Sequence, residues 1–342
     1  MNGSAQECIA GSMKKLQHIL TDRYFEGTVS NDLVYEWEDQ LSQSLGVSFL
    51  KNWSHSQNKY IRRIPGLSNF ITKGQLTLSF VMNANFGRFY QWKNTNDIIP
   101  VIIDFFLKKE DLPRFRNNFK HCPLVLISSK EAYDFLIDNH IDLPIHHWAL
   151  SIADKYKISK DTRFDKKYDL VMMGRQNDVL SDFVKKYAET HPDFTYVYRV
   201  IKGEPGHRSF FYYTSDGENL GDIVGRDQYI ALMRQSRCGL YATPGIDTDG
   251  TRTNGFNQVT PRFLEYIASG CHILARYPKN SDTEYFELDR FCHSINSYEK
   301  FESRMDYCRS HNVDMDTYSK YLEKHYTSAR AKELTEILNN IK

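Results

Sequence analysis

The sequence has 342 residues, with 44 Lys and Arg against 43 Asp and Glu, so its formal net charge is +1 at neutral pH. This balance excludes the strongly basic surface that is typical of nucleic-acid-binding proteins, and no run of Lys or Arg supplies such a surface locally. A chain of this length usually forms more than one hydrophobic core. We therefore expect two domains and no nucleic-acid partner.

Helical periodicity and apolar runs define the first half of the chain. Leucine or tryptophan recurs every four residues between Leu33 and Leu45, which predicts an amphipathic helix over 31–46. A further helix is expected over 10–22. Apolar runs predict strands at 76–82, 98–104 and 124–129, and a helix is expected at 130–139. Apolar strands that alternate with helices indicate a parallel sheet covered on both faces.

In a sheet of this kind the ligand crevice lies beyond the carboxyl ends of the strands. Asp104 and Ser128-Ser129 are placed there by the strand predictions. A carboxylate in such a crevice can act as a general base, and Asp104 is our candidate catalytic residue. The alternative is a carboxylate that caps the next helix.

A polar stretch at 154–167 separates this series from a second one and is the best candidate for an interdomain linker. The second series predicts strands at 168–173, 194–200, 239–242 and 273–275, and helices at 179–190, 227–236, 261–268 and 315–341. Two doubly wound α/β domains in tandem is the architecture that these patterns favour.

The segment 260–271 carries the most informative pattern. Proline suits a first helical turn, so a helix beginning at Pro261 places Arg262 and Glu265 near its N-terminus, on one face. A helix N-terminus attracts anions such as a diphosphate, and a nearby carboxylate can accept hydrogen bonds from a ribose diol. The same spacing is also typical of two surface charges that merely pair with each other.

The arrangement Arg-x-x-Glu-x-x-Ala-x-Gly over 262–270 resembles the donor-binding helix of GT-B glycosyltransferases, of the group 1 type found in bacterial capsule and lipopolysaccharide pathways. Three further segments resemble that family in the same order: a strand and turn at 170–175, a helix–strand–proline unit at 233–244, and a closing helix at 324–331. The resemblance covers 168–335 well and 95–150 loosely, and it does not reach 1–70.

The resemblance implies two Rossmann-like domains that face a central cleft. An acceptor-binding domain is expected over 1–153 and a nucleotide-sugar-binding domain over 168–314, with a closing helix at about 315–342 that packs back on the first domain. The implied function is sugar transfer from a nucleotide-sugar donor to a glycan or lipid-linked acceptor, in the synthesis of a bacterial surface polysaccharide. No cofactor beyond the donor and no metal is expected.

The resemblance also assigns roles to single residues. Glu265 corresponds to the glutamate that contacts the nucleotide ribose, and Arg175 to a basic residue that often meets the diphosphate. The expected substrate-binding residues are Gly174, Arg175, Thr243, Pro244, Arg252, Asn257, Thr260, Arg262 and Glu265.

Two features depart from the family. Retaining members of a large branch carry a second glutamate eight positions before the first, where this chain has Asn257. An amide can bind sugar hydroxyls, but it cannot stabilise a positive transition state by charge. The stereochemical outcome therefore stays open. The glycine-rich first strand-loop of the fold is also missing, so we expect a trimmed or unusual first domain.

The loop 243–255 joins a strand end to the donor helix, so we expect it to bound the sugar-diphosphate. Its polar and flexible residues are Gly245, Asp247, Asp249, Gly250, Arg252, Asn254 and Gly255. It lacks the spacing of a calcium loop. Asp247-Thr248-Asp249 has the letters of a D-x-D metal motif, but it does not stand at a strand end. A plain mobile surface loop is the alternative.

Histidines and cysteines give weaker signals. His146 and His147 are adjacent, so their side chains point to opposite faces of an extended segment, and we expect structural hinge residues. The six cysteines are scattered, which favours free thiols over zinc or disulfides.

Residues 1–20 lack an uninterrupted apolar stretch, and no run of about 18 apolar residues occurs. We expect a cytoplasmic protein, with any membrane contact peripheral and at the inner face.

Two other interpretations stay open. A nucleotide-sugar epimerase of the same fold would carry the same ribose glutamate, but also a glycine-rich first loop and several acidic catalytic residues that the sequence does not reveal. A non-catalytic carbohydrate- or nucleotide-binding protein descended from the fold would be consistent with Asn257.

Overall fold

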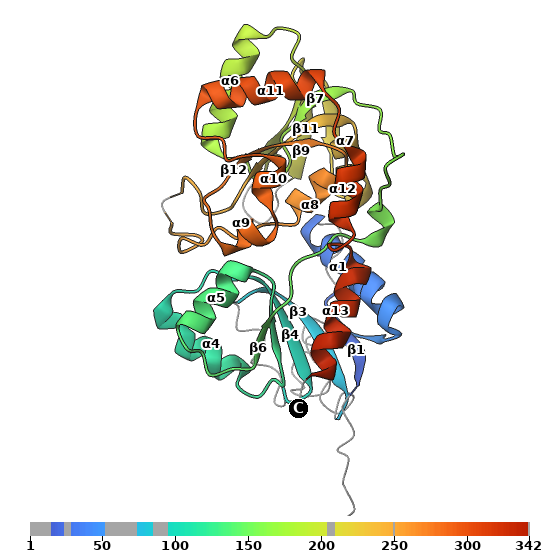
Figure 1. Ribbon diagram of the computed structural model, residues 1–342, viewed down its shortest axis with the longest axis vertical. Coiled ribbons are helices and arrows are strands. Elements are labelled where there is room, and N and C mark those ends of the chain that lie inside the picture. The colour runs from blue at the N-terminus through green and yellow to red at the C-terminus, as the bar shows by residue number, and fades with distance from the viewer. Residues whose placement is uncertain are drawn as a thin grey trace, which may run out of the picture.

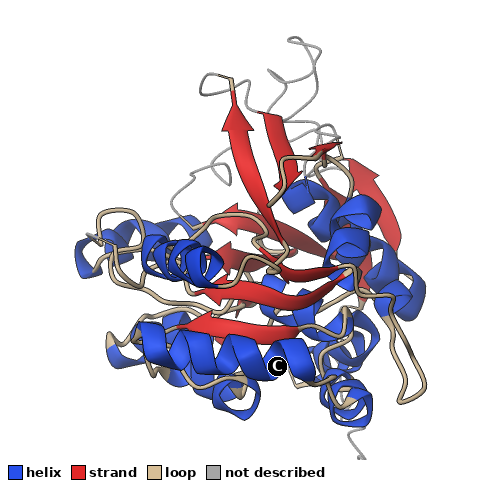
Figure 2. Cartoon of the chain, turned by 90° about the horizontal axis from the view of Figure 1, so that it is seen from above, coloured by secondary structure: helices blue, strands red, loops and turns tan. Residues whose placement is uncertain are grey.

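The computed structural model describes residues 15–23, 29–51, 74–84, 95–203, 209–248 and 250–340. These residues form two α/β halves, stacked one above the other in Figure 1, with the N-terminal half below. Seen from above, helices flank the strands on both sides (Figure 2). Both halves thus have the covered-sheet arrangement that the apolar strands predict.

The N-terminal half is built on a six-stranded parallel sheet with the order β2-β1-β3-β4-β5-β6. Its strands are β1 Leu16–Thr21, β2 Ser48–Lys51, β3 Leu76–Asn83, β4 Ile98–Asp104, β5 Val125–Ile127 and β6 Ile145–His147. Its helices are α1 Val29–Leu45, α4 Leu112–Phe119 and α5 Lys130–Asp138, with a short 3-10 turn at Lys109–Asp111. The helix predicted at 31–46 and the strands predicted from 76 onward are confirmed.

The helix predicted over 10–22 is wrong where the structure describes it, because Leu16–Thr21 forms strand β1. β1 lies between β2 and β3, and its residues Leu16, Ile19 and Leu20 are buried. A short apolar run buried on both faces cannot be told from a helical turn by periodicity. A first strand β1 and a first helix α1 are both present, and the connecting residues 24–28 lie outside the described part. That the first domain is trimmed or unusual stays a prediction.

The C-terminal half is built on a second six-stranded sheet with the order β10-β9-β8-β7-β11-β12. Its strands are β7 Tyr168–Val171, β8 Tyr196–Lys202, β9 Ser209–Thr214, β10 Asn219–Asp222, β11 Ser236–Ala242 and β12 His272–Arg276. Strands β8, β7, β11 and β12 pair in parallel, whereas β9 and β10 add an antiparallel edge that the sequence analysis did not predict.

Eight helices complete this part of the chain as the structure describes it. They are α6 Asp178–Thr190, α7 Arg226–Arg234, α8 Arg262–Ala268, α9 Ser281–Tyr285, α10 Leu288–Phe291, α11 Tyr298–Ser310, α12 Met315–Leu322 and α13 Thr327–Asn339. The single helix predicted over 315–341 is wrong, because it is interrupted between α12 and α13. At the interruption, backbone groups that would bond within a continuous helix bond to Ile152 instead. The Ile152 N–H donates to the His325 carbonyl at 3.0 Å, and the Ile152 carbonyl accepts from the Thr327 N–H at 3.0 Å.

Helix α13 leaves the C-terminal half and packs on α1 of the N-terminal half (Figure 1). Ala331, Leu334 and Ile337 of α13 join a buried cluster that contains Leu41 and Trp148. The halves also meet where α1 faces α7 and where α5 faces α9. The last helix is therefore part of the N-terminal core.

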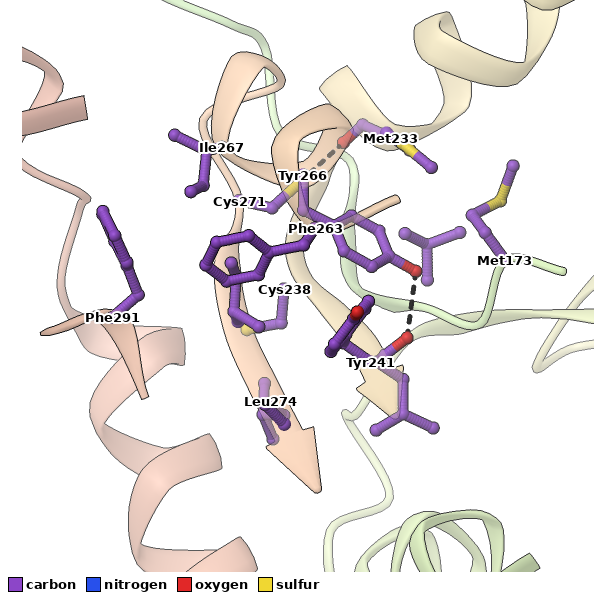
Figure 3. Close-up of a cluster of buried hydrophobic side chains, with 14 of the residues drawn as sticks. Met173, Met233, Cys238, Tyr241, Phe263, Tyr266, Ile267, Cys271, Leu274 and Phe291 are labelled. Atoms are coloured by element: carbon purple, nitrogen blue, oxygen red, sulfur yellow. Dashed lines mark hydrogen bonds between the residues drawn. The ribbon is translucent and has the colours of Figure 1, made fainter. Parts of the chain in front are cut away.

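The position of α8 is fixed by close packing on β11. Figure 3 shows Phe263, Tyr266 and Ile267 of α8 among the buried side chains of this half. The Tyr266 hydroxyl donates to the Leu240 carbonyl at 3.1 Å. A side chain on Gly239 would lie 2.3 Å from the Tyr266 ring, so glycine is required for this approach.

Two further observations concern the cysteines and the helices as possible membrane spans. Cys122, Cys238, Cys271, Cys292 and Cys308 are all free and buried, as expected, while Cys8 lies outside the described residues. Among the described helices, none combines the length and the apolar character that crossing a bilayer requires.

Candidate functional site

A cavity of about 540 Å³ lies between the two halves. The N-terminal half contributes the first turn of α1, with Val29, Ser30 and Leu33, and the end of β4, with Asp104 and Phe106. The C-terminal half contributes the turns after β7 and β11 and the starts of α6, α7 and α8. The cavity thus lies at carboxyl ends of strands in both sheets, where doubly wound folds bind ligands.

Most of the site residues predicted from the sequence meet in this cleft. The structure brings together Asp104, Arg175, Thr243, Pro244, Arg252, Thr260, Arg262 and Glu265. Gly174 and Asn257 are not among the lining residues.

Gly174 lies behind Arg262. Its φ is +65°, in the left-handed region, and a side chain placed on it would come within 2.3 Å of the Arg262 Nη2. The guanidinium of Arg262 therefore packs directly on the Gly174 backbone, and its Nε is buried without a hydrogen-bond partner among the described residues. Gly174 acts on the cleft through Arg262, not by contact of its own.

Asn257 is buried inside the loop and does not line the cleft, and its polar groups bond to other residues. Its Oδ1 accepts from the Thr243 hydroxyl at 2.9 Å, and its Nδ2 donates to the Gly255 carbonyl at 3.0 Å. Its backbone N–H donates to the Glu131 carboxylate of α5 at 2.7 Å. Asn257 therefore holds Thr243 in place at the cleft and ties the loop to the N-terminal half.

Glu265 differs most from expectation. The alternative interpretation requires a surface charge, but the residue is only 3% exposed. Its partner is not Arg262: the Arg226 Nη1, at the start of α7, lies 2.6 Å from the Glu265 Oε1. The sequence analysis missed Arg226, because nothing in its spacing from Glu265 signals a contact between two different helices.

Asp104 has the environment of a general base. Its Oδ1 accepts a hydrogen bond from the Gln258 Nε2 at 2.9 Å. Burial raises the pKa of Asp104 to about 6, partly opposed by the Arg252 charge and the Gln258 hydrogen bond. The alternative role as a helix cap is wrong, because the next helical turn begins after Lys108.

Several arginines and two helix N-termini lie on the C-terminal side of the cleft. Helix α6 begins there at Asp178, with the Asn177 side chain accepting from the Leu180 N–H at 3.0 Å. Helix α8 begins there too, and helix N-termini carry partial positive charge. Among the described residues, Arg175, Arg252 and Arg262 form no salt bridge with a carboxylate, so their charges remain for an anionic ligand.

The loop 243–255 is packed where the structure describes it, so the alternative of a plain mobile surface loop is not supported. Thr253 is buried, and Asn254 donates to the Phe106 carbonyl of the N-terminal half. Asp247 forms a two-point pair with Arg276, at 2.7 and 2.5 Å, which lowers its pKa. Asp249 lies outside the described residues. In the described part of the chain, no three His, Cys, Asp or Glu side chains gather as a metal site.

The two histidines lie away from the cleft. His146 is exposed and His147 is half-buried, so they point to opposite faces of β6 as expected. The His147 ring contacts Tyr285 of α9 with centroids 4.7 Å apart, and burial lowers its pKa to about 4. This contact joins the two halves, which agrees with a structural role.

Comparison with known proteins gives a sequence match and several structural ones. Residues 181–336 match the model of a family described as glycosyl transferase-like. AviGT4, a glycosyltransferase involved in avilamycin A biosynthesis, is 11% identical, covers 95% of this chain and 97% of its own, and has a TM-score of 0.58. At that identity the likeness shows the fold, and the predicted GT-B arrangement of two α/β halves is confirmed.

Two other structures are similar with lower scores. A putative UDP-N-acetylglucosamine 2-epimerase from Listeria monocytogenes is 13% identical, with coverage of 95% of this chain and 96% of that chain and a TM-score of 0.49. The GtfA/B complex is 11% identical over 78% of this chain, with a TM-score of 0.45, and this chain spans only 57% of it. No curated protein sequence matches this chain.

Proposed function

We propose that this chain, whose residues 181–336 match a glycosyl transferase-like family and which has the GT-B fold, moves a sugar from a nucleotide-sugar donor to a glycan or lipid-linked acceptor. The pathway that we propose is the synthesis of a bacterial surface polysaccharide, such as a capsule or lipopolysaccharide. The reaction would take place in the cytoplasm, at the inner face of the membrane when the acceptor is lipid-linked.

The observation that carries the proposal is the group of cations on the C-terminal wall of the cleft. Arg175 and Arg262 lie beside the start of α6, and neither has a carboxylate partner among the described residues. A diphosphate is an anion of matching size and charge, and arginine binds its oxygens in a planar, two-point geometry. Glu265 lies on the same wall and would accept hydrogen bonds from the ribose.

Asp104 faces this wall from the other half and would act on the acceptor. In an inverting displacement, the acceptor hydroxyl oxygen attacks the anomeric carbon while the bond from that carbon to the diphosphate oxygen breaks. The hydroxyl proton passes to the Asp104 carboxylate, and the nucleoside diphosphate leaves against Arg175 and Arg262. A pKa of about 6 leaves Asp104 ionised at neutral pH and basic enough to take the proton.

We further propose that the reaction needs no divalent metal. The groups assigned to the leaving diphosphate are arginines and a helix N-terminus, which can offset its charge without an ion. Asp247, the first carboxylate of the D-x-D sequence, already pairs with Arg276 and accepts from Asn177 at 2.9 Å. Turnover with excess EDTA should therefore continue; complete loss that manganese or magnesium restores would contradict metal independence.

The function is tested by incubating the protein with a panel of nucleotide sugars and measuring free nucleotide and sugar products. Slow release of nucleoside diphosphate from one donor, accelerated by an acceptor glycan, is expected. Conversion of the sugar without nucleotide release would indicate an epimerase, and binding without any product would indicate a non-catalytic protein. Arg262→Ala should weaken a nucleoside diphosphate far more than the matching nucleoside; equal weakening would show that Arg262 does not contact phosphate.

A further inference from the structure

Arg226 stands between two carboxylates that come from the two halves of the molecule. Its Nη1 lies 2.6 Å from the Glu265 Oε1 of α8, and its Nε lies 3.4 Å from the Glu36 Oε2 of α1. The side chains of Arg226 and Glu265 are each 4% exposed. Contacts at two edges hold the planar guanidinium in one orientation, and one of these contacts crosses the interface between the halves.

Glu36 is itself held in place from the linker. The Lys155 Nζ lies 3.0 Å from the Glu36 Oε1, and the Tyr156 hydroxyl donates to the same oxygen at 2.6 Å. Glu36 lies one helical turn beyond Leu33, which lines the cleft, but is not itself a lining residue. A continuous chain of polar contacts therefore runs from the linker through Glu36 and Arg226 to Glu265.

The surroundings of Glu265 depend on this chain of contacts. A carboxylate buried to this degree needs a nearby cation or hydrogen-bond donors to offset the loss of water. Arg226 supplies that cation, and the contact of its guanidinium with Glu36 at the other edge orients it toward Glu265. Loss of the Glu36 charge would leave the guanidinium held by a carboxylate only at its Glu265 edge, so that its plane could rotate about that contact.

We propose that Glu36 is a positioning residue for donor recognition, acting through Arg226 on the ribose-binding carboxylate of Glu265. The proposal rests on the proposed function, in which Glu265 meets the ribose. It means that a residue of the acceptor-binding half completes the donor site of the other half. By reciprocity, ribose binding should also strengthen the contact between the halves.

The test is calorimetry on the full chain with UDP, ADP and GDP, followed by the 2′-deoxy form of the one that binds best. Glu36→Gln keeps the size of the side chain but removes its charge. We expect the variant to bind the ribonucleotide about 5- to 50-fold more weakly, with a smaller loss for the deoxynucleotide, so that the preference for ribose shrinks. Asp227→Asn is the matched control, because Asp227 also contacts Lys155, at 2.9 Å, but is largely exposed.

Arg226→Lys gives a second variant, since lysine keeps the charge but cannot bridge two carboxylates with a planar group. It should shrink the ribose preference in the same way. Unchanged affinity in Glu36→Gln, or an equal loss for both nucleotides, would overturn the positioning role and leave the proposed function standing. A wild-type protein that binds none of the three nucleotides would overturn the proposed function together with this inference.

Discussion

Glu265 and Arg226 form a buried ion pair, and this determines what the removal of either side chain does. In Glu265→Ala the Arg226 guanidinium loses its 2.6 Å partner, stays buried and keeps only the longer 3.4 Å contact with Glu36. Breaking a buried ion pair by removing one partner typically costs about 3 kcal/mol or more. We therefore expect Glu265→Ala to lower the free energy of unfolding by about 3 kcal/mol, measured by urea denaturation at pH 7.

The matched control is Glu189→Ala, which removes an exposed carboxylate from α6 and should change stability little. An unfolding midpoint in Glu265→Ala equal to the wild type would show that the pair contributes nothing to the fold. Loss of nucleotide binding in Glu265→Ala can be assigned to a lost ribose contact only if the variant is shown to be folded under the conditions of the binding experiment.

Replacement of Asp104 by Asn is predicted to raise the stability of the fold and to lower the activity. Because its pKa is raised to about 6 in the folded protein, folding disfavours the ionised form, and stability is lost as the pH rises from the unfolded value of 3.8 through about 6. Asp104→Asn should therefore be more stable than the wild type at pH 8. It should also lose at least about 100-fold in kcat, because the base is gone.

Wild-type kcat should fall as the pH is lowered through about 6, since the base is then protonated, and this acid limb should be missing from the residual activity of Asp104→Asn. A variant with normal kcat, or one that keeps the acid limb, would show that another group takes the proton.

A residue that lines the cleft could be predicted from the sequence when it stands at the end of a strand or the start of a helix. Asp104, Arg175 and Arg262 follow from that rule and line the cleft. Arg226 and Glu36 could not be predicted, because their contact joins residues 190 positions apart in the chain. Asn257 aligned with a family position, yet the hydrogen-bond network around it is visible only in three dimensions.

At the level of elements, the turn from β7 to α6 sets the position of a binding residue on α8. In Gly174→Ala the added methyl group would meet the Arg262 Nη2 at 2.3 Å, at a φ of +65° that disfavours a side chain. The guanidinium must move, so the affinity for a nucleoside diphosphate should fall about 10-fold or more, while the nucleoside is affected less. Calorimetry with both ligands measures this difference.

Gly217→Ala provides the control, because Gly217 also has a positive φ, of +94°, but has open space around it. If both alanine variants bind the diphosphate equally well, the contact of Arg262 with the turn does not shape the site.

Helix α13 is predicted to contribute to the stability of the N-terminal half. Leu334 is fully buried in the cluster around Leu41 and Trp148. Leu334→Ala should lower the free energy of unfolding by about 2–5 kcal/mol, through lost burial and a cavity. Chemical denaturation followed by tryptophan fluorescence measures it. Glu336→Ala, on the exposed face of the same helix, is the control, and equal midpoints for the two variants would contradict the docking of α13.

Elements were predicted correctly where the apolar pattern is long enough to distinguish the helical period of 3.6 residues from the strand period of two. β4 and α1 are examples. β1 was taken for a helix because six residues with buried faces on both sides fit either period. The break between α12 and α13 has no proline or glycine to signal it, and it arises because Ile152 supplies hydrogen bonds from a distant segment.

On the scale of the whole molecule, Asp282 of α9 bonds the two halves. Its Oδ1 accepts from the Lys130 N–H, at the start of α5, at 2.7 Å, and its Oδ2 accepts from the Val259 N–H. Asp282→Ala removes both acceptors, so the amide protons of Lys130 and Val259 should exchange faster. Hydrogen exchange at single-residue resolution measures this.

Glu284→Ala, an exposed change on the same helix, should leave both exchange rates as they are. Slow exchange that persists in Asp282→Ala would show that the halves are held together without this carboxylate.

Within the described residues the chain passes between the halves twice, near 151–154 and near 325–328. The two passages are bonded together through Ile152 and Thr327, and the Ser151 and Thr327 hydroxyls lie 2.9 Å apart. Because the two passages are bonded to each other, sliding of the halves at this crossing is hindered, whereas rotation about it is not. Any opening of the cleft by such a rotation must also break contacts away from the crossing, such as those of Asp282 with Lys130 and of Arg226 with Glu36.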